Sequence, residues 1–359
     1  MENTETSVTP SIDNHSIKHT SDVKFHGKAG EFFAIWIVNL LLSIITLGIY
    51  SAWAKVRTNR YFYSNTEIDG HRFSYLADPI QILKGRIIGV VLFGAYFLAS
   101  AFSPIAALVI MLLLLAATPF LICLSIRFKM RMTAYRNVRF NFKGGFGEAF
   151  IMFILLPIAS MFTLYLALPW VLKKMDEFIY SNVTFGDKKV QTDLKTGEYY
   201  IASFGAFFIG VALFAIALFA LGGSLAALKD PEAMKQMSSS LIILMVVYVL
   251  VILLASSFYT ARIRNHIFNH SRIEEVASFK SELTVSKLVW LHLTNFIALI
   301  CTLGFAMPWA HVRSAKLYAQ ATQVNILEGA DKVLVDASGS ASAVAEEVAG
   351  VFDVDIALG

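Results

Sequence analysis

The chain has 359 residues, of which 57% are hydrophobic and only 16% are charged, with a formal net charge of +4 and a mean hydropathy of +0.63. A soluble domain is closer to half apolar and a quarter charged, so this composition excludes an ordinary soluble protein and predicts an integral membrane protein. The small, scattered positive charge argues against nucleic acid as a partner and suits loops that meet anionic lipid headgroups.

Three parts of the chain differ in polarity. Residues 1–24 are polar and predict a disordered tail, residues 25–326 predict a membrane domain, and residues 327–359 predict a flexible C-terminal tail. Crossing a bilayer takes about 20 helical residues, and the longest uncharged stretch is divided near Ser103 and Pro104, so we count seven apolar helices. Asp, Glu, Lys and Arg are absent from 32–54, 87–126, 149–172, 199–228, 241–261 and 288–310.

One phrase of the sequence occurs twice. Asn39-x6-Thr46-Leu47-Gly48-x4-Trp53-Ala54-x-Val56-Arg57 returns as Asn295-x6-Thr302-Leu303-Gly304-x4-Trp309-Ala310-x-Val312-Arg313. A weaker third copy keeps Leu164, Trp170 and Lys174. We name the three copies A segments (roughly 25–75, 142–193 and 281–326) and the intervening stretches B segments (80–141 and 195–280). The sequence therefore predicts internal repeats in the order A-B-A-B-A.

Short strands are expected where the apolar runs lead into long polar loops. Each run ends in a basic, aromatic helical stalk, followed by Asn and then a strand-like stretch. Asp69-Gly70 lies between alternating residues, which is typical of a β-hairpin turn. The predicted fold class is an all-α polytopic membrane protein with internal repeats and small cytoplasmic β-hairpins.

The A segments are interrupted at nearly the same depth, by Asn39, Pro157 and Asn295. Proline breaks the helical hydrogen-bond ladder, and asparagine competes for backbone hydrogen bonds. If A segments enter and leave on one face, every Lys and Arg except Lys229 and Lys235 lies on that face, as the positive-inside rule favours. We therefore expect four spanning helices plus three re-entrant segments, with the C-terminus in the cytoplasm. Seven spanning helices with local kinks are the alternative.

The A segments supply two sets of candidate binding residues. An aromatic residue and a cation four residues later lie on one helix face and can bind a lipid phosphate, or simply anchor the helix at the interface. These candidate lipid-headgroup residues are Trp53, Arg57, Trp170, Lys174, Trp309 and Arg313. Broken segments form the substrate sites of many transporters, which makes Asn39, Thr46, Asn295 and Thr302 candidate pathway-lining residues.

Residues that would carry catalysis are not recognisable in the sequence. His266 and His270 are four residues apart and are a weak metal candidate, but no cysteine or carboxylate completes the set nearby, although Glu274 and Glu275 are a turn further on. We find no nucleophile with a base, no paired acids within an apolar run and no nucleotide fingerprint. The sequence therefore predicts neither an enzyme nor a protein with a metal or cofactor.

Several motifs resemble those of the YjgN-like family of bacterial inner-membrane proteins. They are Asn39 with Thr46-Leu47-Gly48-Ile49-Tyr50 and Trp53, Arg60-Tyr61 with Asn65, and Gly70-x-Arg72-Phe73-Ser74-Tyr75, and the likeness extends over most of 22–325. The resemblance implies an integral inner-membrane protein of a family with no established activity, and it assigns no functional residues.

Two functions fit these expectations. The first is a channel or transporter for a small neutral or amphipathic solute. The alternative is a structural or lipid-organising protein that acts as a homo-oligomeric scaffold among anionic lipids.

Overall fold

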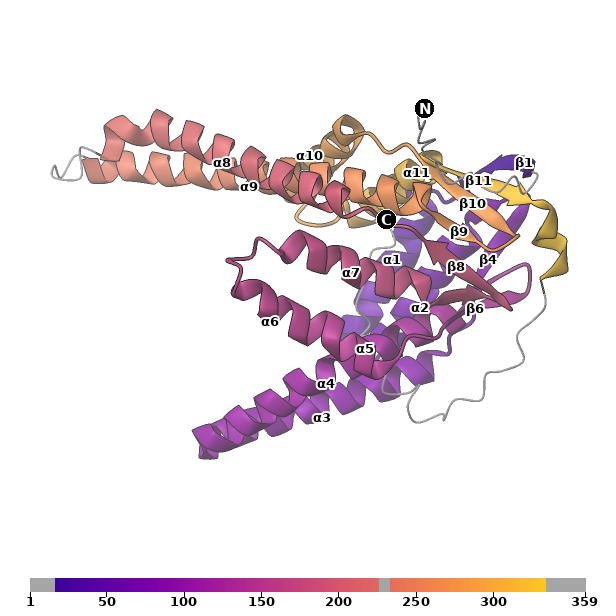
Figure 1. Ribbon diagram of the computed structural model, residues 1–359. Helices are drawn as coiled ribbons and strands as arrows, with labels where there is room; N and C mark the ends of the chain where they lie inside the picture. The colour runs from indigo at the N-terminus through magenta and orange to yellow at the C-terminus, as the bar shows by residue number, and fades with distance from the viewer. Residues whose placement is uncertain (1–16, 226–232, 334–359) are drawn as a thin grey trace, which may run out of the picture.

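The structure of the chain is a computed structural model that describes residues 17–225 and 233–333 (Figure 1). Over these residues the elements form five successive units, each a pair of helices that leads into strands of one sheet. The first unit holds α1 (Ala29–Ile45), α2 (Ser51–Ser64), β3 (Thr66–Ile68) and β4 (His71–Tyr75). The second holds α3 (Pro79–Phe102), α4 (Pro104–Arg131), β5 (Thr133–Tyr135) and β6 (Val138–Phe142).

The third unit has a broken first helix. It consists of α5 (Phe146–Phe150), the π-helical turn η1 (Ile151–Leu155) and α6 (Leu156–Met161), followed by α7 (Leu168–Ser181), β7 (Val183–Phe185) and β8 (Lys188–Thr192). The fourth holds α8 (Thr196–Leu225), α9 (Ala233–Asn269), β9 (Ser271–Ile273) and β10 (Ala277–Ser281). The fifth holds α10 (Val285–Cys301), α11 (Met307–Gln320) and β11 (Thr322–Leu327), and the 3-10 turn η2 (Glu328–Lys332) follows.

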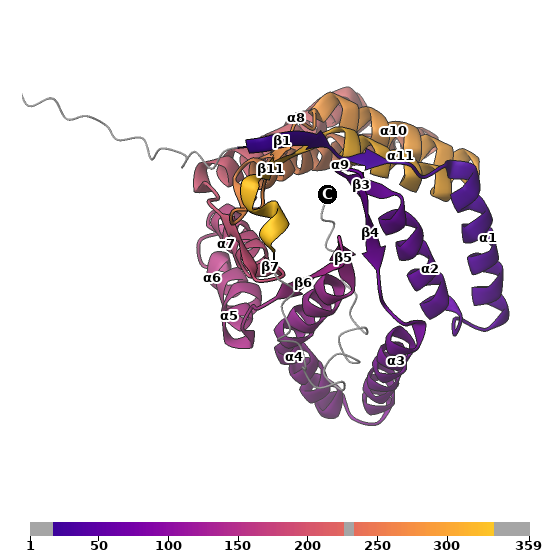
Figure 2. The same ribbon diagram turned by 90° about the vertical axis from the view of Figure 1, so that its right-hand side faces the viewer.

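The strands form one antiparallel sheet rather than separate hairpins. Its order is β1-β11-β10-β9-β8-β7-β6-β5-β4-β3-β2. Its two outer strands, β1 (Ile17–Asp22) and β2 (Lys24–Phe25), are separated in the chain only by Val23. Since β1 pairs with β11 and β2 pairs with β3, the bent N-terminal strand brings the two ends of the sheet together. Figure 2 shows the strands around the resulting ring, with the helices arranged about it.

Equivalent backbone hydrogen bonds tie each unit to the next. In four of these bonds the residue after a strand donates its N–H to the carbonyl at the helix–strand junction of the next unit, and in the fifth His26, after β2, donates in the same way to the first unit, all at 2.8–3.0 Å. The five bonds run from His26 to Asn65, Leu76 to Met132, Lys143 to Asn182, Asp193 to His270 and Glu282 to Ala321. Residues of the sheet, among them Phe185, Ile273 and Val324, form an apolar core, against which Ala330 and Val333 pack.

The all-α fold class with small hairpins was therefore wrong. Each hairpin leaves an unpaired edge, and an exposed edge favours pairing with another strand. Here the edges pair with one another, for example Phe73 of β4 with Tyr135 of β5, until the 11 strands of the described residues form a nearly closed sheet. Strand β1 and Lys24 of β2 lie within the predicted N-terminal tail of residues 1–24, so the end of that tail is part of the sheet. Residues 1–16 and 334–359 of the two predicted tails lie outside the described residues.

The helix pairs project from the sheet toward one side (Figure 1). In the part of the chain that the structure describes, four helices are long and apolar enough to cross a membrane: Pro79–Phe102, Pro104–Arg131, Thr196–Ala217 and Leu244–Asn269. At about 1.5 Å per residue, 22 to 28 residues reach roughly 33–42 Å, more than a hydrocarbon core of about 30 Å. Helices α8 and α9 approach closely at Gly205. A Cβ at this position would overlap the ring of Phe258 on α9.

The A segments fold back at a turn of the same form. Leu47 and Gly48 have φ angles of 49° and 92°, Leu303 and Gly304 have 50° and 91°, and Leu164 and Tyr165 have 51° and 62°. Each turn reverses the chain, so both ends of the helix pair lie at the sheet. Seven spanning helices do not agree with this arrangement. A common origin of the three segments stays a prediction.

Candidate functional site

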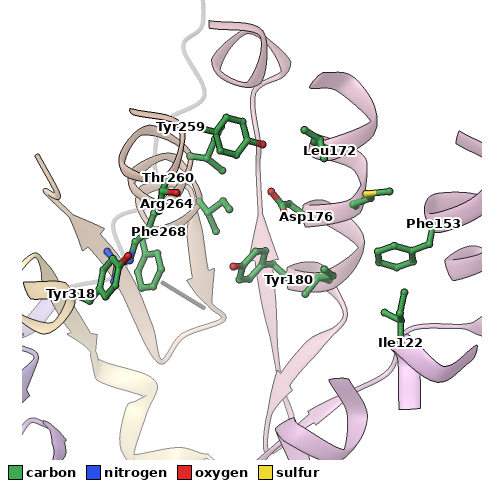
Figure 3. A pocket seen from close by; sticks show the side chains of 14 residues that line it. Ile122, Phe153, Leu172, Asp176, Tyr180, Tyr259, Thr260, Arg264, Phe268 and Tyr318 are labelled. Atoms are coloured by element: carbon green, nitrogen blue, oxygen red, sulfur yellow. The ribbon is translucent and has the colours of Figure 1, made fainter. Parts of the chain in front are cut away.

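A cavity of about 390 Å³ lies among helices of four units. Most of its wall comes from α7 and α9, and Figure 3 shows these two helices on opposite sides of it. The lining residues are Leu172, Met175, Asp176, Ile179 and Tyr180 of α7, Tyr259, Thr260, Ile263, Arg264, Ile267 and Phe268 of α9, and Ile122, Phe153 and Tyr318 from α4, η1 and α11.

The α7 wall carries a carboxylate in otherwise apolar surroundings. The hydroxyl of Tyr199, a fully buried residue of α8, donates a hydrogen bond of 2.6 Å to Asp176 Oδ2. Burial raises the pKa of Asp176 to about 6, although the Tyr199 hydrogen bond acts in the opposite direction. Among the described residues, no ion pair involves Asp176; the lysines beside it on α7, Lys173 and Lys174, pair with Glu177.

The α9 wall carries a guanidinium group that is held away from Asp176. Arg264 is only 8% exposed and donates to Ser281 Oγ at 2.6 Å and to Thr322 Oγ1 at 2.9 Å. Its Cζ lies 4.3 Å from the ring centroid of Phe268 and 5.1 Å from that of Tyr318. Figure 3 shows Arg264 beside these rings and across the cavity from Asp176. The two charges are therefore held on opposite walls.

Tyrosine hydroxyls add hydrogen-bonding capacity to the cavity. Burial, reinforced by the charge of Asp176, raises the pKa of Tyr180, and burial also raises that of Tyr318. Both phenols therefore stay protonated at neutral pH and can donate hydrogen bonds. An apolar cavity with a few fixed polar groups is the usual form of a small-molecule site, and this one suits an amphipathic ligand.

The candidate pathway-lining residues lie outside this cavity, within the hairpins of the first and third A segments. Asn39 is 5% exposed and donates from Nδ2 to Ala54 O at 3.4 Å, whereas Asn295 is 8% exposed and accepts a 3.3 Å bond from Arg313. Thr46 and Thr302 donate to the carbonyls four residues earlier, at 2.7 Å. These contacts join the two helices of a hairpin or shape the turn between them. That the four residues line a pathway stays a prediction.

The candidate lipid-headgroup residues lie near the starts of α2, α7 and α11. The guanidinium of Arg313 lies 4.9 Å from the Trp309 ring centroid and hydrogen-bonds Thr294. Arg57 is exposed, and Lys174 pairs with Glu177 at 3.0 Å. Trp53 stacks on Tyr50, while Trp170 and Trp309 are 37% and 41% exposed. The structure does not bring the six residues together, and lipid binding by them stays a prediction.

The two candidate metal-binding histidines lie side by side, with ring centroids 4.2 Å apart. His266 Nε2 accepts the backbone N–H of Lys195 at 2.8 Å, and His270 Nδ1 contacts the carbonyl of His266 at 2.9 Å. Across residues 17–225 and 233–333, no three His, Cys, Asp or Glu side chains are grouped as a metal site would require.

Sequence reasoning missed the cavity residues. Asp176 lies in a charged helical stalk, next to Glu177 and after Lys173 and Lys174, and this pattern is typical of a solvent-exposed residue. A signal was nevertheless present, because Leu172, Asp176 and Tyr180 follow one another at helical spacing and share a face. An acid in the middle of an otherwise apolar helix face indicates an inward-facing charge.

The four long apolar helices define an integral membrane protein with a cavity among its helices. The family model described as "Bacterial protein of unknown function (DUF898)" matches residues 20–351, so the chain belongs to this family. It is also similar to the inner membrane protein YjgN of Escherichia coli O157:H7, with 28% identity over 331 residues, which cover 79% of this chain and 83% of that protein.

Two further relatives carry the same name. YjgN of Escherichia coli strain K12 is 29% identical over 302 residues, covering 70% of this chain and 75% of that protein. YjgN of Salmonella typhimurium is 34% identical over 165 residues, which cover 45% of this chain and 40% of that protein. No solved structure matches the chain. The expected resemblance to the YjgN-like family is therefore confirmed, as is the expectation of an inner-membrane protein.

Proposed function

We propose that this protein binds a small amphipathic solute in the cavity between α7 and α9, as the substrate site of a membrane transporter. The observation that carries the proposal is the cavity itself: about 390 Å³, largely apolar, with a carboxylate on one wall and a guanidinium on the other. A solute with an apolar body and a polar end matches such a lining. The proposal involves binding and movement of the solute, without enzymatic conversion.

The proposed orientation places the sheet in the cytoplasm. The basic residues of α3 and α4 support it, because Lys84 and Arg86 lie in the first turns of α3, and Arg127, Lys129 and Arg131 lie in the last turns of α4. Both positions adjoin the sheet, and basic residues favour the cytoplasmic face. In this orientation β11 and η2, and therefore the chain that continues to the C-terminus, are cytoplasmic.

Filling the cavity tests the proposal. Thr260 lines the cavity on α9, so Thr260→Trp should occupy the ligand's space. Ser256 lies one turn earlier and is exposed, so Ser256→Trp adds the same side chain outside the cavity and is the matched control. Native mass spectrometry of the purified proteins should show a bound small molecule on the wild type and on Ser256→Trp, but not on Thr260→Trp.

Movement of the solute is tested with the molecule so identified. Proteoliposomes with the wild type or Ser256→Trp should exchange it across the bilayer, whereas those with Thr260→Trp should not. Equal exchange by all three proteins, or by liposomes without protein, would refute transport through this cavity.

A lipid-organising scaffold is the second candidate, and the turns of the A segments favour it. Leu47, Leu164 and Leu303 at the turns are 94%, 85% and 90% exposed, an unfavourable arrangement in water that contact with lipid chains would relieve. With Arg313 placed against Trp309, these turns could order anionic lipids around a homo-oligomer. Loss of copurified anionic lipid in Arg57→Ala/Arg313→Ala would support this function, and unchanged lipid content would count against it.

A further inference from the structure

We propose that the ligand of the cavity is an organic cation, an amine with an apolar body, and that Asp176 is its counter-charge. This inference rests on the proposed binding function and names its substrate class. The juxtaposition behind it is a carboxylate that has no cationic partner among residues 17–225 and 233–333, set in a cavity whose lining includes several aromatic rings.

The carboxylate is under-satisfied as it stands. An ionised carboxylate can accept about four hydrogen bonds, yet the single hydrogen bond to Asp176 in the described part of the chain comes from Tyr199. An ionised group in apolar surroundings is costly unless it is paired. A protonated amine in the cavity would supply both the opposite charge and N–H donors, which makes it the ligand chemistry that relieves this cost.

The neighbouring rings suit the same ligand. Tyr259 on α9 and Tyr180 on α7 flank the carboxylate, and Figure 3 shows the Tyr259 hydroxyl directed toward Asp176. Acceptor oxygens on the two phenols can take hydrogen bonds from an ammonium group.

The other charge of the cavity does not compete for Asp176. The guanidinium of Arg264 is occupied by Ser281 and Thr322 and lies against the rings of Phe268 and Tyr318. These contacts hold it on the α9 wall and cover it with apolar surface. Nε of Arg264 has no hydrogen-bond partner among the described residues, so an anion is the competing ligand that the octanoate probe tests, whereas a cationic ligand reaches Asp176 without disturbing the Arg264 contacts.

Three probes with the same apolar chain separate the possibilities. They are n-octylamine, 1-octanol and octanoate, which are cationic, neutral and anionic at pH 7.5. Each is titrated calorimetrically into the full chain in lipid nanodiscs, with empty nanodiscs subtracted. The variants are Asp176→Asn, which keeps an oxygen for the Tyr199 hydrogen bond, and Asp187→Asn, an equivalent change in the β7–β8 turn at a residue that does not line the cavity.

We expect octylamine to bind the wild type about tenfold more tightly than octanol, and Asp176→Asn to weaken octylamine binding by about tenfold while leaving octanol unchanged. Asp187→Asn should match the wild type. Unchanged octylamine affinity in Asp176→Asn, or tighter binding of octanoate than of octylamine, would overturn the inference.

Thr260→Trp distinguishes failure of this inference from failure of the proposed function. If octanol or octanoate binds, loses binding in Thr260→Trp and outcompetes octylamine, the cavity is a ligand site but not a cation site. If Thr260→Trp changes the binding of none of the three probes, both proposals fall.

Discussion

Removing the charge of Asp176 should stabilise the protein at neutral pH. Burial raises the pKa of this carboxyl from 3.8 to about 6, so the folded protein holds the proton more tightly than the unfolded chain does. Stability therefore falls as the pH rises from about 3.8 to about 6, and the ionised carboxylate remains a net cost above this window. Asp176→Asn removes that cost and keeps an acceptor for Tyr199.

The size of the effect follows from the same pKa. A difference of about 2 pH units, at about 1.4 kcal/mol for each unit, corresponds to roughly 3 kcal/mol. Because the side chain borders a cavity and is only partly buried, solvent screening reduces this to about 1–2 kcal/mol. At roughly 2–4 °C per kcal/mol for a domain of this order of size, the variant should gain about 2–8 °C in Tm at pH 7.5.

Thermal unfolding in nanodiscs, followed by tryptophan fluorescence between pH 4 and 8, measures this gain. The advantage of Asp176→Asn should be full at pH 7.5 and shrink below pH 6, whereas Asp187→Asn should show no gain. A variant that is less stable than the wild type at pH 7.5, or a difference that does not vary with pH, would refute the reasoning. A gain in stability together with loss of amine binding is the trade-off expected of a binding site.

The remaining predictions concern the framework around the cavity. Gly205→Ala should destabilise the α8–α9 pair by about 1–3 kcal/mol, because the added methyl group meets the facing phenylalanine ring of α9. As a control, Gly94→Ala places its methyl group in open space and should be neutral or stabilising in the same unfolding assay. The double variant Thr20→Cys/Asn325→Cys should form a disulfide under mild oxidation, because these residues are paired across β1 and β11. Mass spectrometry of proteolytic fragments detects this crosslink, and its absence would contradict the closed sheet. Arg264→Met should cost about 2 kcal/mol in the unfolding assay, since two buried hydroxyls lose their donor; unchanged stability would show that these bonds contribute little.

The sequence predicted local structure well and long-range pairing poorly. The Asp69-Gly70 turn and the asparagine-ended stalks correctly indicated hairpins, since such signals depend on residues close in the chain. Closure of the sheet depends on contacts between distant segments, such as Thr20 with Asn325, which no local pattern encodes. The polar stretch of β1 is stabilised by this pairing rather than by burial, so its composition resembled that of a disordered tail.

The candidate site shows the same limit. Asp176 and Glu177 are adjacent acids in one stalk, but only Asp176 faces the cavity, while Glu177 pairs with Lys173 and Lys174. Which acid turns inward follows from helical spacing. That this face borders a cavity depends on where α9 and α11 pack, and their positions are set by the ring.

A density map of the wild-type protein in lipid nanodiscs with n-octylamine tests the central claim most directly, because it shows whether the cavity is a ligand site. We predict an elongated density between α7 and α9 whose polar end lies within hydrogen-bonding distance of Asp176, and which is lost in Thr260→Trp. A cavity closed by its own side chains, or a map in which octylamine occupies only the lipid around the helices, would contradict the account.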